Sequence, residues 1–275
     1  MDGDPFHIRS HVENFDDIVG DIVRRSAAAR RDIPMIGDIR YGEGPGETLD
    51  LFFPQGPRRN LPVHLFIHGG YWRMFSKRDY SYIAQAITAA GAIAVIIDYA
   101  LMPTVRLEVL VDQTRQAARW VTDTIASHGG DPHRLSVSGH SAGAHLASFL
   151  LHEDRPHPGA KTAFLLGGLY DLKPLQSSFL AAEIGLTDEE VRRFTPLMQA
   201  YDPACEVILA IGADETPPFH DQARQFAKLL QSQTVKVRSL SFTGQNHMSS
   251  VQGLGIPGTE IGQSLMMVLK QIEPD

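Results

Sequence analysis

One stretch of the sequence decides the fold: Leu135-Ser-Val-Ser-Gly-His-Ser-Ala-Gly-Ala-His-Leu-Ala-Ser-Phe-Leu-Leu151. Residues 135–138 form a short β-like run, and the apolar residues from Ala142 to Leu150 recur at helical spacing. Between the two segments lies Gly139-His140-Ser141-Ala142-Gly143. The stretch therefore predicts a strand, a sharp turn that carries a serine, and a helix.

This Gly-x-Ser-x-Gly turn resembles the nucleophile elbow of α/β-hydrolases. Glycines two residues before and after Ser141 permit a turn tight enough to lift the serine hydroxyl above the sheet. The N–H groups at the start of the following helix favour negative charge at the same place. A simple Gly/Ser turn is the alternative, but the flanking strand and helix favour the elbow.

Composition agrees with an ordinary soluble enzyme of one domain, and together with the elbow motif this predicts a single α/β-hydrolase domain over residues 1–275. The chain is 43% hydrophobic and 21% charged, and its length allows one large core. The net charge is −7, and no basic run is longer than Arg24-Arg25 or Arg30-Arg31. These features argue against nucleic acid or an anionic membrane as a partner and favour a small-molecule substrate.

Cysteine usage and the N-terminus bear on cofactors and location. Cys205 is the only cysteine, which excludes an internal disulfide and a zinc site of clustered cysteines. The first residues are acidic where a signal peptide is basic, and no apolar run reaches the roughly 18 residues of a membrane span. We therefore expect a cytoplasmic location. The sequence leaves the oligomeric state open between a monomer and a homodimer.

The remaining chain alternates apolar strands with helical stripes, as in a mostly parallel sheet with helices on both faces and right-handed crossovers. The expected strands are residues 63–67, 92–97, 135–138, 163–166, 207–211 and 235–240, and the expected helices are 80–90, 110–125, 142–150, 219–230 and 261–272. Before them, residues 36–41 and 48–53 predict a hairpin at a sheet edge, and residues 15–23 an amphipathic helix over the mouth or side of the sheet, where it could act as a lid. Residues 173–204 carry weak helical signals, which suits a small helical cover.

A serine, a carboxylate and a histidine follow one another in the order that α/β-hydrolases use. Ser141 and His247 each follow a predicted strand, and the adjacent carboxylates Asp214 and Glu215 lie just beyond the strand that ends at Ile211. The carboxyl ends of parallel strands meet at one edge of a sheet, where the sites of open α/β sheets lie. The sequence thus predicts Ser141 as nucleophile, His247 as base and one of the two carboxylates as its partner.

Stabilising an oxyanion requires N–H donors near the serine. We expect the N–H of Ala142 to supply one donor. The glycine-rich loop His68-Gly-Gly-Tyr-Trp72 lets the N–H of Gly70 or Tyr71 approach from the other side. His68 itself more often braces such a loop by hydrogen bonding than performs chemistry.

Trp72, His140, Tyr170 and Met248 are the predicted substrate-binding residues, although each alone is more often a core residue. Phe179 and Tyr99 are further candidates for lining a pocket, and they too are more often core residues. Several histidines surround the elbow helix, namely His140, His145, His152 and His157. Their spacing does not give an i, i+4 ligand pair, so we expect neither a metal nor another cofactor.

Four motifs together resemble the kynurenine formamidase (arylformamidase) group of α/β-hydrolases, which adjoins the hormone-sensitive-lipase-like esterases. They are His68-Gly-Gly-Tyr-Trp72, Gly139-His-Ser-Ala-Gly-Ala-His-Leu146, Gly168-Leu-Tyr-Asp-Leu-Lys-Pro-Leu175 and Glu215-Thr-Pro-Pro-Phe219. The resemblance spans residues 61–247 and implies hydrolysis of an aryl formamide such as N-formylkynurenine, without metal or cofactor. Its register favours Glu215 over Asp214 as the acid, although animal members carry aspartate there. Asn246 stands where an acidic residue often precedes the histidine.

Three functions remain open on the sequence alone. The first is an arylformamidase that acts through an acyl-enzyme. The second is a carboxylesterase for short-chain or aryl esters. The third is a catalytically inactive hydrolase fold that binds a ligand, and the presence of a serine, a histidine and an acid in the required order argues against it.

Overall fold

Eight strands form one sheet in the computed structural model, which describes residues 3–153 and 159–270. Their spatial order is β1-β2-β4-β3-β5-β6-β7-β8. β2 pairs antiparallel with both β1 and β4, and the other neighbours in this sheet are parallel. The predicted edge hairpin and the mostly parallel sheet are therefore confirmed. The strands are β1 (Met35–Arg40), β2 (Thr48–Phe52), β3 (Leu61–Ile67), β4 (Ile93–Ile97), β5 (Gly130–His140), β6 (Thr162–Leu166), β7 (Glu206–Gly212) and β8 (Lys236–Phe242).

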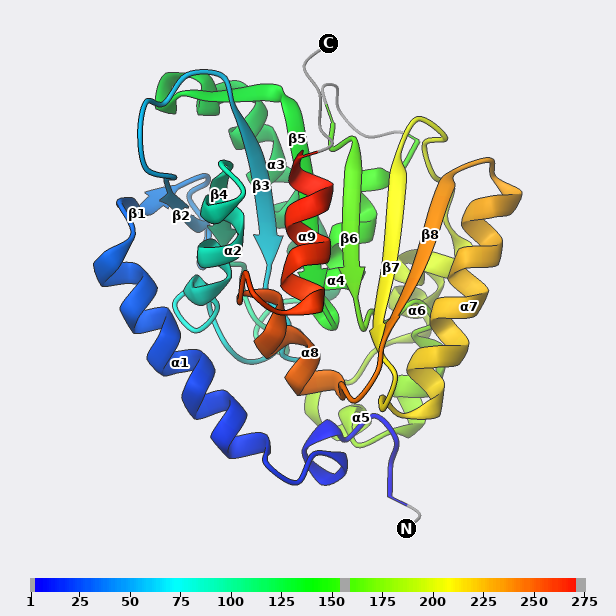
Figure 1. Cartoon of the computed structure of the whole chain (residues 1–275). Coiled ribbons are helices and arrows are strands. Elements are labelled where there is room, and N and C mark those ends of the chain that lie inside the picture. The colour runs from blue at the N-terminus through cyan, green and yellow to red at the C-terminus, as the bar shows by residue number, and fades with distance from the viewer. Residues whose placement is uncertain (1–2, 154–158, 271–275) are drawn as a thin grey trace.

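Helices cover both faces of this sheet (Figure 1). The helices α1, α2, α8 and α9 contact one another on one face, and α3 and α4 pack on the other. No helix in residues 3–153 or 159–270 is both long and apolar enough to cross a bilayer. The α-helices are α1 (Phe15–Asp32), α2 (Ala84–Ala89), α3 (Leu107–Thr124), α4 (Ala142–Ser148), α5 (Leu180–Ile184), α6 (Asp188–Phe194), α7 (Pro217–Ser232), α8 (His247–Leu254) and α9 (Glu260–Lys270).

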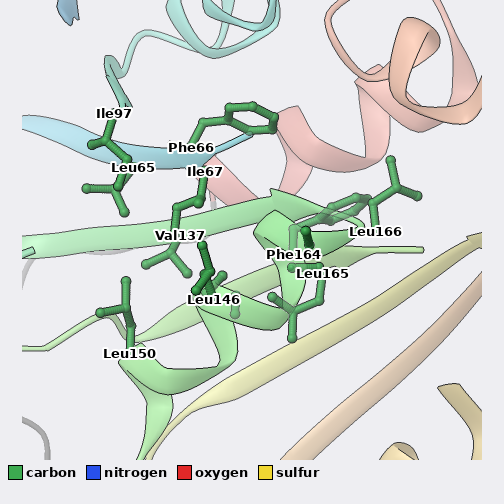
Figure 2. Packing of buried hydrophobic residues seen from close by; sticks show 14 of the residues in the cluster. Leu65, Phe66, Ile67, Ile97, Val137, Leu146, Leu150, Phe164, Leu165 and Leu166 are labelled. Carbon is green, nitrogen blue, oxygen red and sulfur yellow. The ribbon is translucent and has the colours of Figure 1, made fainter. Parts of the chain in front are cut away.

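The central strands are buried on both faces, which explains their continuous apolar sequences. Leu65 of β3, Val137 of β5 and Phe164 of β6 lose all contact with solvent, and Leu146 of α4 packs among them (Figure 2). Each such side chain contributes about 1.5–3 kcal/mol relative to an exposed one. This packing fixes the strand ends and hence the loops that leave them.

The loops after β3, β5, β7 and β8 leave the sheet at the same edge, the lower one in Figure 1. Four sequence motifs therefore meet there: the glycine-rich loop 68–72, the elbow at Ser141, the carboxylates at 214–215 and the loop before His247. The fold thus brings together residues that lie as far apart in sequence as His68 and His247, which are separated by 179 positions.

Three elements differ from the sequence-based prediction. The N-terminal helix, expected at residues 15–23, continues to Asp32. The helix expected at residues 80–90 is a 3-10 turn, Ser81–Ile83, followed by the short α2. β5 begins at Gly130 instead of Leu135, so most of the predicted turn at residues 129–132 lies in the strand. The cause is pairing with β3: the N–H of Leu61 donates to the carbonyl of Gly129 (3.0 Å), and Leu61 is in register with Gly130.

Residues 173–204 connect β6 to β7 without adding a strand to the sheet. They contain two 3-10 helices, Lys173–Ser177 and Pro196–Met198, and the short helices α5 and α6 between them. A capping box between Thr187 and Glu190 defines the start of α6. Arg106, just before α3, also pairs with the Glu190 carboxylate, which ties this segment to the body of the molecule.

Candidate active site

Ser141 lies at the turn between β5 and α4 in a backbone conformation that non-glycine residues rarely adopt, with φ 55° and ψ −120°. Its N–H donates to the carbonyl of Leu166 at 2.9 Å, which holds the turn against β6. A Cβ at Gly139 would lie 2.2 Å from the Gly143 oxygen, and one at Gly143 would lie 2.1 Å from the Ile67 oxygen. Both elbow glycines are therefore required by close backbone contacts.

The close contact at Gly143 gives a testable consequence for stability. Gly143→Ala should lower the free energy of unfolding by roughly 3 kcal/mol, because neither the new methyl nor the opposing backbone can move away easily. Urea denaturation measures this difference. Gly258→Ala is the matched control, since a Cβ there meets nothing within 4 Å. Equal stability of the two variants would contradict the packing argument.

His247, the first residue of α8, contacts a carboxylate through its ring. Its Nδ1 lies 2.7 Å from Oε2 of Glu215, whose side chain is fully buried. The other carboxylate oxygen accepts a hydrogen bond from the N–H of Gly212 at 3.1 Å. Asp214 is exposed, so the structure brings Glu215 and not Asp214 to the histidine.

Asn246 fixes the start of α8 and thereby the position of His247. Its side chain accepts hydrogen bonds from the N–H groups of Met248 (3.0 Å) and Ser249 (2.9 Å), and the Ser249 hydroxyl accepts from the Asn246 N–H (2.9 Å). This is a capping box at the helix N-terminus. Asn246, which departs from the family pattern, thus caps α8. The spacing Asn-x-x-Ser in the sequence already indicates such a cap.

His140 supports His247 from the elbow side. Its Nε2 donates to the carbonyl of His247 at 3.0 Å, and the two ring centroids are 4.5 Å apart. Burial holds the pKa of His140 well below its ordinary value. The His140 ring is therefore neutral at pH 7 and adds no positive charge beside His247. Its single N–H group, on Nε2, is the donor to the His247 carbonyl.

The loop after β3 is held in an unusual conformation by its own side chains. Gly70 has φ 110°, and Tyr71 and Trp72 follow with φ 53° and 60°. Such backbone strain persists only where surrounding contacts fix it. The Trp72 indole N–H donates to Nδ1 of His145 (3.2 Å), and His68 Nδ1 donates to the carbonyl of Gly69 (2.8 Å). The prediction that His68 braces its own loop is thus confirmed.

A small cavity lies over Ser141 and His247. Its empty space, counted with its open mouth, is about 310 Å³. It is lined by Ile8, Phe15, Gly70, Tyr71, Met74, Phe75, Tyr80, His140, Ser141, His247 and Met248. Of the predicted substrate-binding residues, the structure brings His140 and Met248 to this cavity.

Trp72 and Tyr170, the other two, are not among the lining residues. Trp72 is completely buried against His145, and Tyr170 stacks on Phe226 with ring centroids 4.2 Å apart. The expected pocket roles of these two side chains are therefore corrected to core packing. Ile8 and Phe15 line the cavity instead; the apolar spacing of the N-terminal region indicated only a lid-like helix from residue 15.

The histidines near the elbow helix do not gather around a common point. His145 Nε2 donates to the carbonyl of Phe194, and His152 packs against Phe149 and Tyr201. Within residues 3–153 and 159–270, no group of three or more His, Cys, Asp or Glu side chains has a metal-binding arrangement. His157 lies outside the described residues.

Comparison with known proteins places this geometry in a family. A model of the α/β hydrolase fold matches residues 64–250, more than half of the chain. The chain belongs to the α/β-hydrolase family. This α/β-hydrolase is 30% identical, over 226 residues, to the kynurenine formamidase of Danio rerio, in an alignment that covers 79% of this chain and 76% of the relative. The resemblance seen in the sequence motifs is therefore confirmed.

Esterases are also similar to this α/β-hydrolase. The isoprenylcysteine α-carbonyl methylesterase of Arabidopsis thaliana is 27% identical over 238 residues, which are 76% of this chain and 55% of that protein. Among solved structures, esterase B of Lactobacillus rhamnosis superposes with a TM-score of 0.74 at 19% identity and covers 96% of both chains. The second likeness shows the fold alone, and the relatives together support a hydrolase.

Proposed function

We propose that this hydrolase acts by a serine mechanism through an acyl-enzyme. The observation that carries the proposal is the buried contact between His247 Nδ1 and Glu215 Oε2 at 2.7 Å. A carboxylate at this place fixes the proton of the imidazole on Nδ1 and leaves Nε2 free to accept one. Ser141, which lines the same cavity as His247, is then the group whose proton Nε2 removes.

The proposed reaction has two halves. The Ser141 oxygen attacks the substrate carbonyl, and the N–H groups of Ala142 and of Gly70 or Tyr71 stabilise the oxyanion. His247 gives the serine proton to the departing amine or alcohol, which leaves an acyl group on Ser141. Water then attacks this ester with His247 as base, the acid is released, and the serine regains its proton.

We further propose an aryl formamide of the N-formylkynurenine type as substrate. The 30% identity to a kynurenine formamidase supports this class, as does a small cavity with aromatic side chains such as Phe15, Phe75 and Tyr80. A formyl group is the smallest acyl group, and aromatic walls suit a flat leaving group. The similarity to a methylesterase favours short or aryl esters as the second candidate.

The two substrate classes predict different specificity constants. For a formamidase, kcat/KM for N-formylkynurenine should exceed that for p-nitrophenyl acetate by about tenfold or more, because binding energy from the aryl amine acts in the transition state. Kinetics of the purified chain with both compounds measure the ratio. Ester turnover without formamide turnover would select the carboxylesterase instead.

A further inference from the structure

The N-terminal residues 4–12, here called the N-terminal strap, cross the edge of the sheet where the site lies (Figure 1). The Thr216 hydroxyl donates to the carbonyl of Pro5 at 2.7 Å, and the ring of Phe6 packs against Phe219, whose ring also contacts His247. The Asp4 carboxylate accepts from the N–H of Phe179. The strap thus connects the loop that carries Glu215 with the helical segment 173–204.

The hydroxyl of Tyr71 joins the strap to the glycine-rich loop. It donates to the carbonyl of Phe6 at 2.9 Å and accepts from the N–H of Ile8 at 3.0 Å. Burial raises the pKa of Tyr71, so its hydroxyl stays protonated and can make both bonds at ordinary pH. One side chain therefore satisfies two backbone groups of the strap and restrains a residue whose own φ is 53°.

The strap also forms part of the wall of the catalytic cavity. Ile8 is 2% exposed, and it lines the same cavity as Ser141 and His247. Phe15, which follows the strap at the start of α1, lines it as well. Trp72 and Tyr170, the other two predicted substrate-binding residues besides His140 and Met248, are buried in the core. The N-terminal region thus supplies two of the residues that line the cavity, Ile8 from the strap and Phe15 from α1.

We propose that the N-terminal strap determines which acyl-chain lengths the site accepts. Long acyl groups clash with Ile8, and the two hydrogen bonds of the Tyr71 hydroxyl to Phe6 and Ile8 hold Ile8 in place. The proposal rests on the serine-hydrolase function above and narrows it to formyl, acetyl and similarly short acyl groups. Ile8 is a specificity-determining residue, and the Tyr71 hydroxyl is a positioning group that acts through the strap.

The test compares two p-nitrophenyl esters, the acetate and the octanoate, in each variant. Ile8→Ala removes three carbons from the wall, and Tyr71→Phe leaves the carbonyl of Phe6 and the N–H of Ile8 without their partner. In both variants the ratio of kcat/KM for acetate to that for octanoate should fall by about tenfold or more, since methylene-sized changes in an apolar pocket alter discrimination on this scale. A general loss of activity cancels in this ratio.

Matched controls separate the proposed role from a loss of stability. Ile22→Ala makes the same substitution at a buried position of α1 that does not line the cavity, and Tyr201→Phe removes a hydroxyl that donates to the carbonyl of Pro196 at 2.9 Å. Their acetate-to-octanoate ratios should stay within about twofold of the wild type. An unchanged ratio in Ile8→Ala and Tyr71→Phe overturns the proposal. Failure of the serine mechanism is a different result, because ester hydrolysis would then survive Ser141→Ala.

Discussion

Ser141→Ala is expected to lower kcat by about 10³-fold or more while the chain stays folded. Without its hydroxyl the elbow offers no nucleophile, so only the oxyanion donors and substrate binding can still accelerate the reaction. The substitution removes one oxygen and leaves the backbone contacts of the turn intact, including the bond from the Ser141 N–H to Leu166. Single-turnover and steady-state kinetics, together with urea denaturation, measure both quantities.

A fluorophosphonate probe provides an independent measure of the same residue. We expect it to label the wild type at Ser141 and to leave Ser141→Ala unlabelled. Ser127→Ala, which removes an exposed hydroxyl that bonds only within its own turn, is the control and should keep full rate and labelling. A Ser141→Ala variant that retained more than about a tenth of the wild-type rate would exclude the serine mechanism.

The fold could be predicted from the sequence because its strands are buried on both faces. Such strands appear as unbroken apolar runs, as in residues 63–67 and 93–97, and the helices between them carry clear stripes. The turn between strand and helix at Ser141 could be predicted as well, because a side chain at Gly139 or Gly143 would collide with the backbone and only glycine fits there. These signals depend on local backbone geometry, which a sequence records directly.

The cavity could not be predicted in the same way, because its walls come from irregular segments. Trp72 follows two residues with positive φ and turns into the core, a direction that no periodic pattern indicates. Thr216 is at the N-cap of α7, but its hydroxyl donates to the carbonyl of Pro5 and does not cap the helix. The N-terminal strap contributes Ile8 from a single 3-10 turn, which has no hydrophobic periodicity.

The choice between Asp214 and Glu215 also lay beyond local sequence signals. Both carboxylates follow β7, and only the resemblance to the Thr-Pro-Pro-Phe register favoured Glu215. In the structure, a tight turn in which the N–H of Glu215 donates to the carbonyl of Gly212 (3.2 Å) directs this side chain inward, while Asp214 stays exposed. Gly167 makes room for the pair, since a Cβ there would lie 3.0 Å from Glu215 Oε1 and 3.1 Å from His247 Nδ1.

Glu215→Gln should therefore lower kcat by about 10³- to 10⁴-fold. The two Glu215 oxygens face two N–H donors, Gly212 N–H at 3.1 Å and His247 Nδ1 at 2.7 Å. A glutamine side chain has only one oxygen, so its NH₂ group must face one of these donors in either orientation. If it faces Nδ1, the imidazole proton moves to Nε2, and the ring can no longer accept the proton of Ser141.

The adjacent carboxylate is the matched control for this variant. Asp214→Asn changes the same functional group one residue away, on an exposed side chain, and should alter kcat by less than about threefold. Steady-state kinetics on one substrate, with urea denaturation to show that both variants are folded, give the comparison. Equal losses of kcat in the two variants would indicate a general effect of negative charge at this loop. A larger loss in Asp214→Asn would assign the acid to Asp214 and would require a different arrangement of the loop from the one in which Glu215 contacts His247.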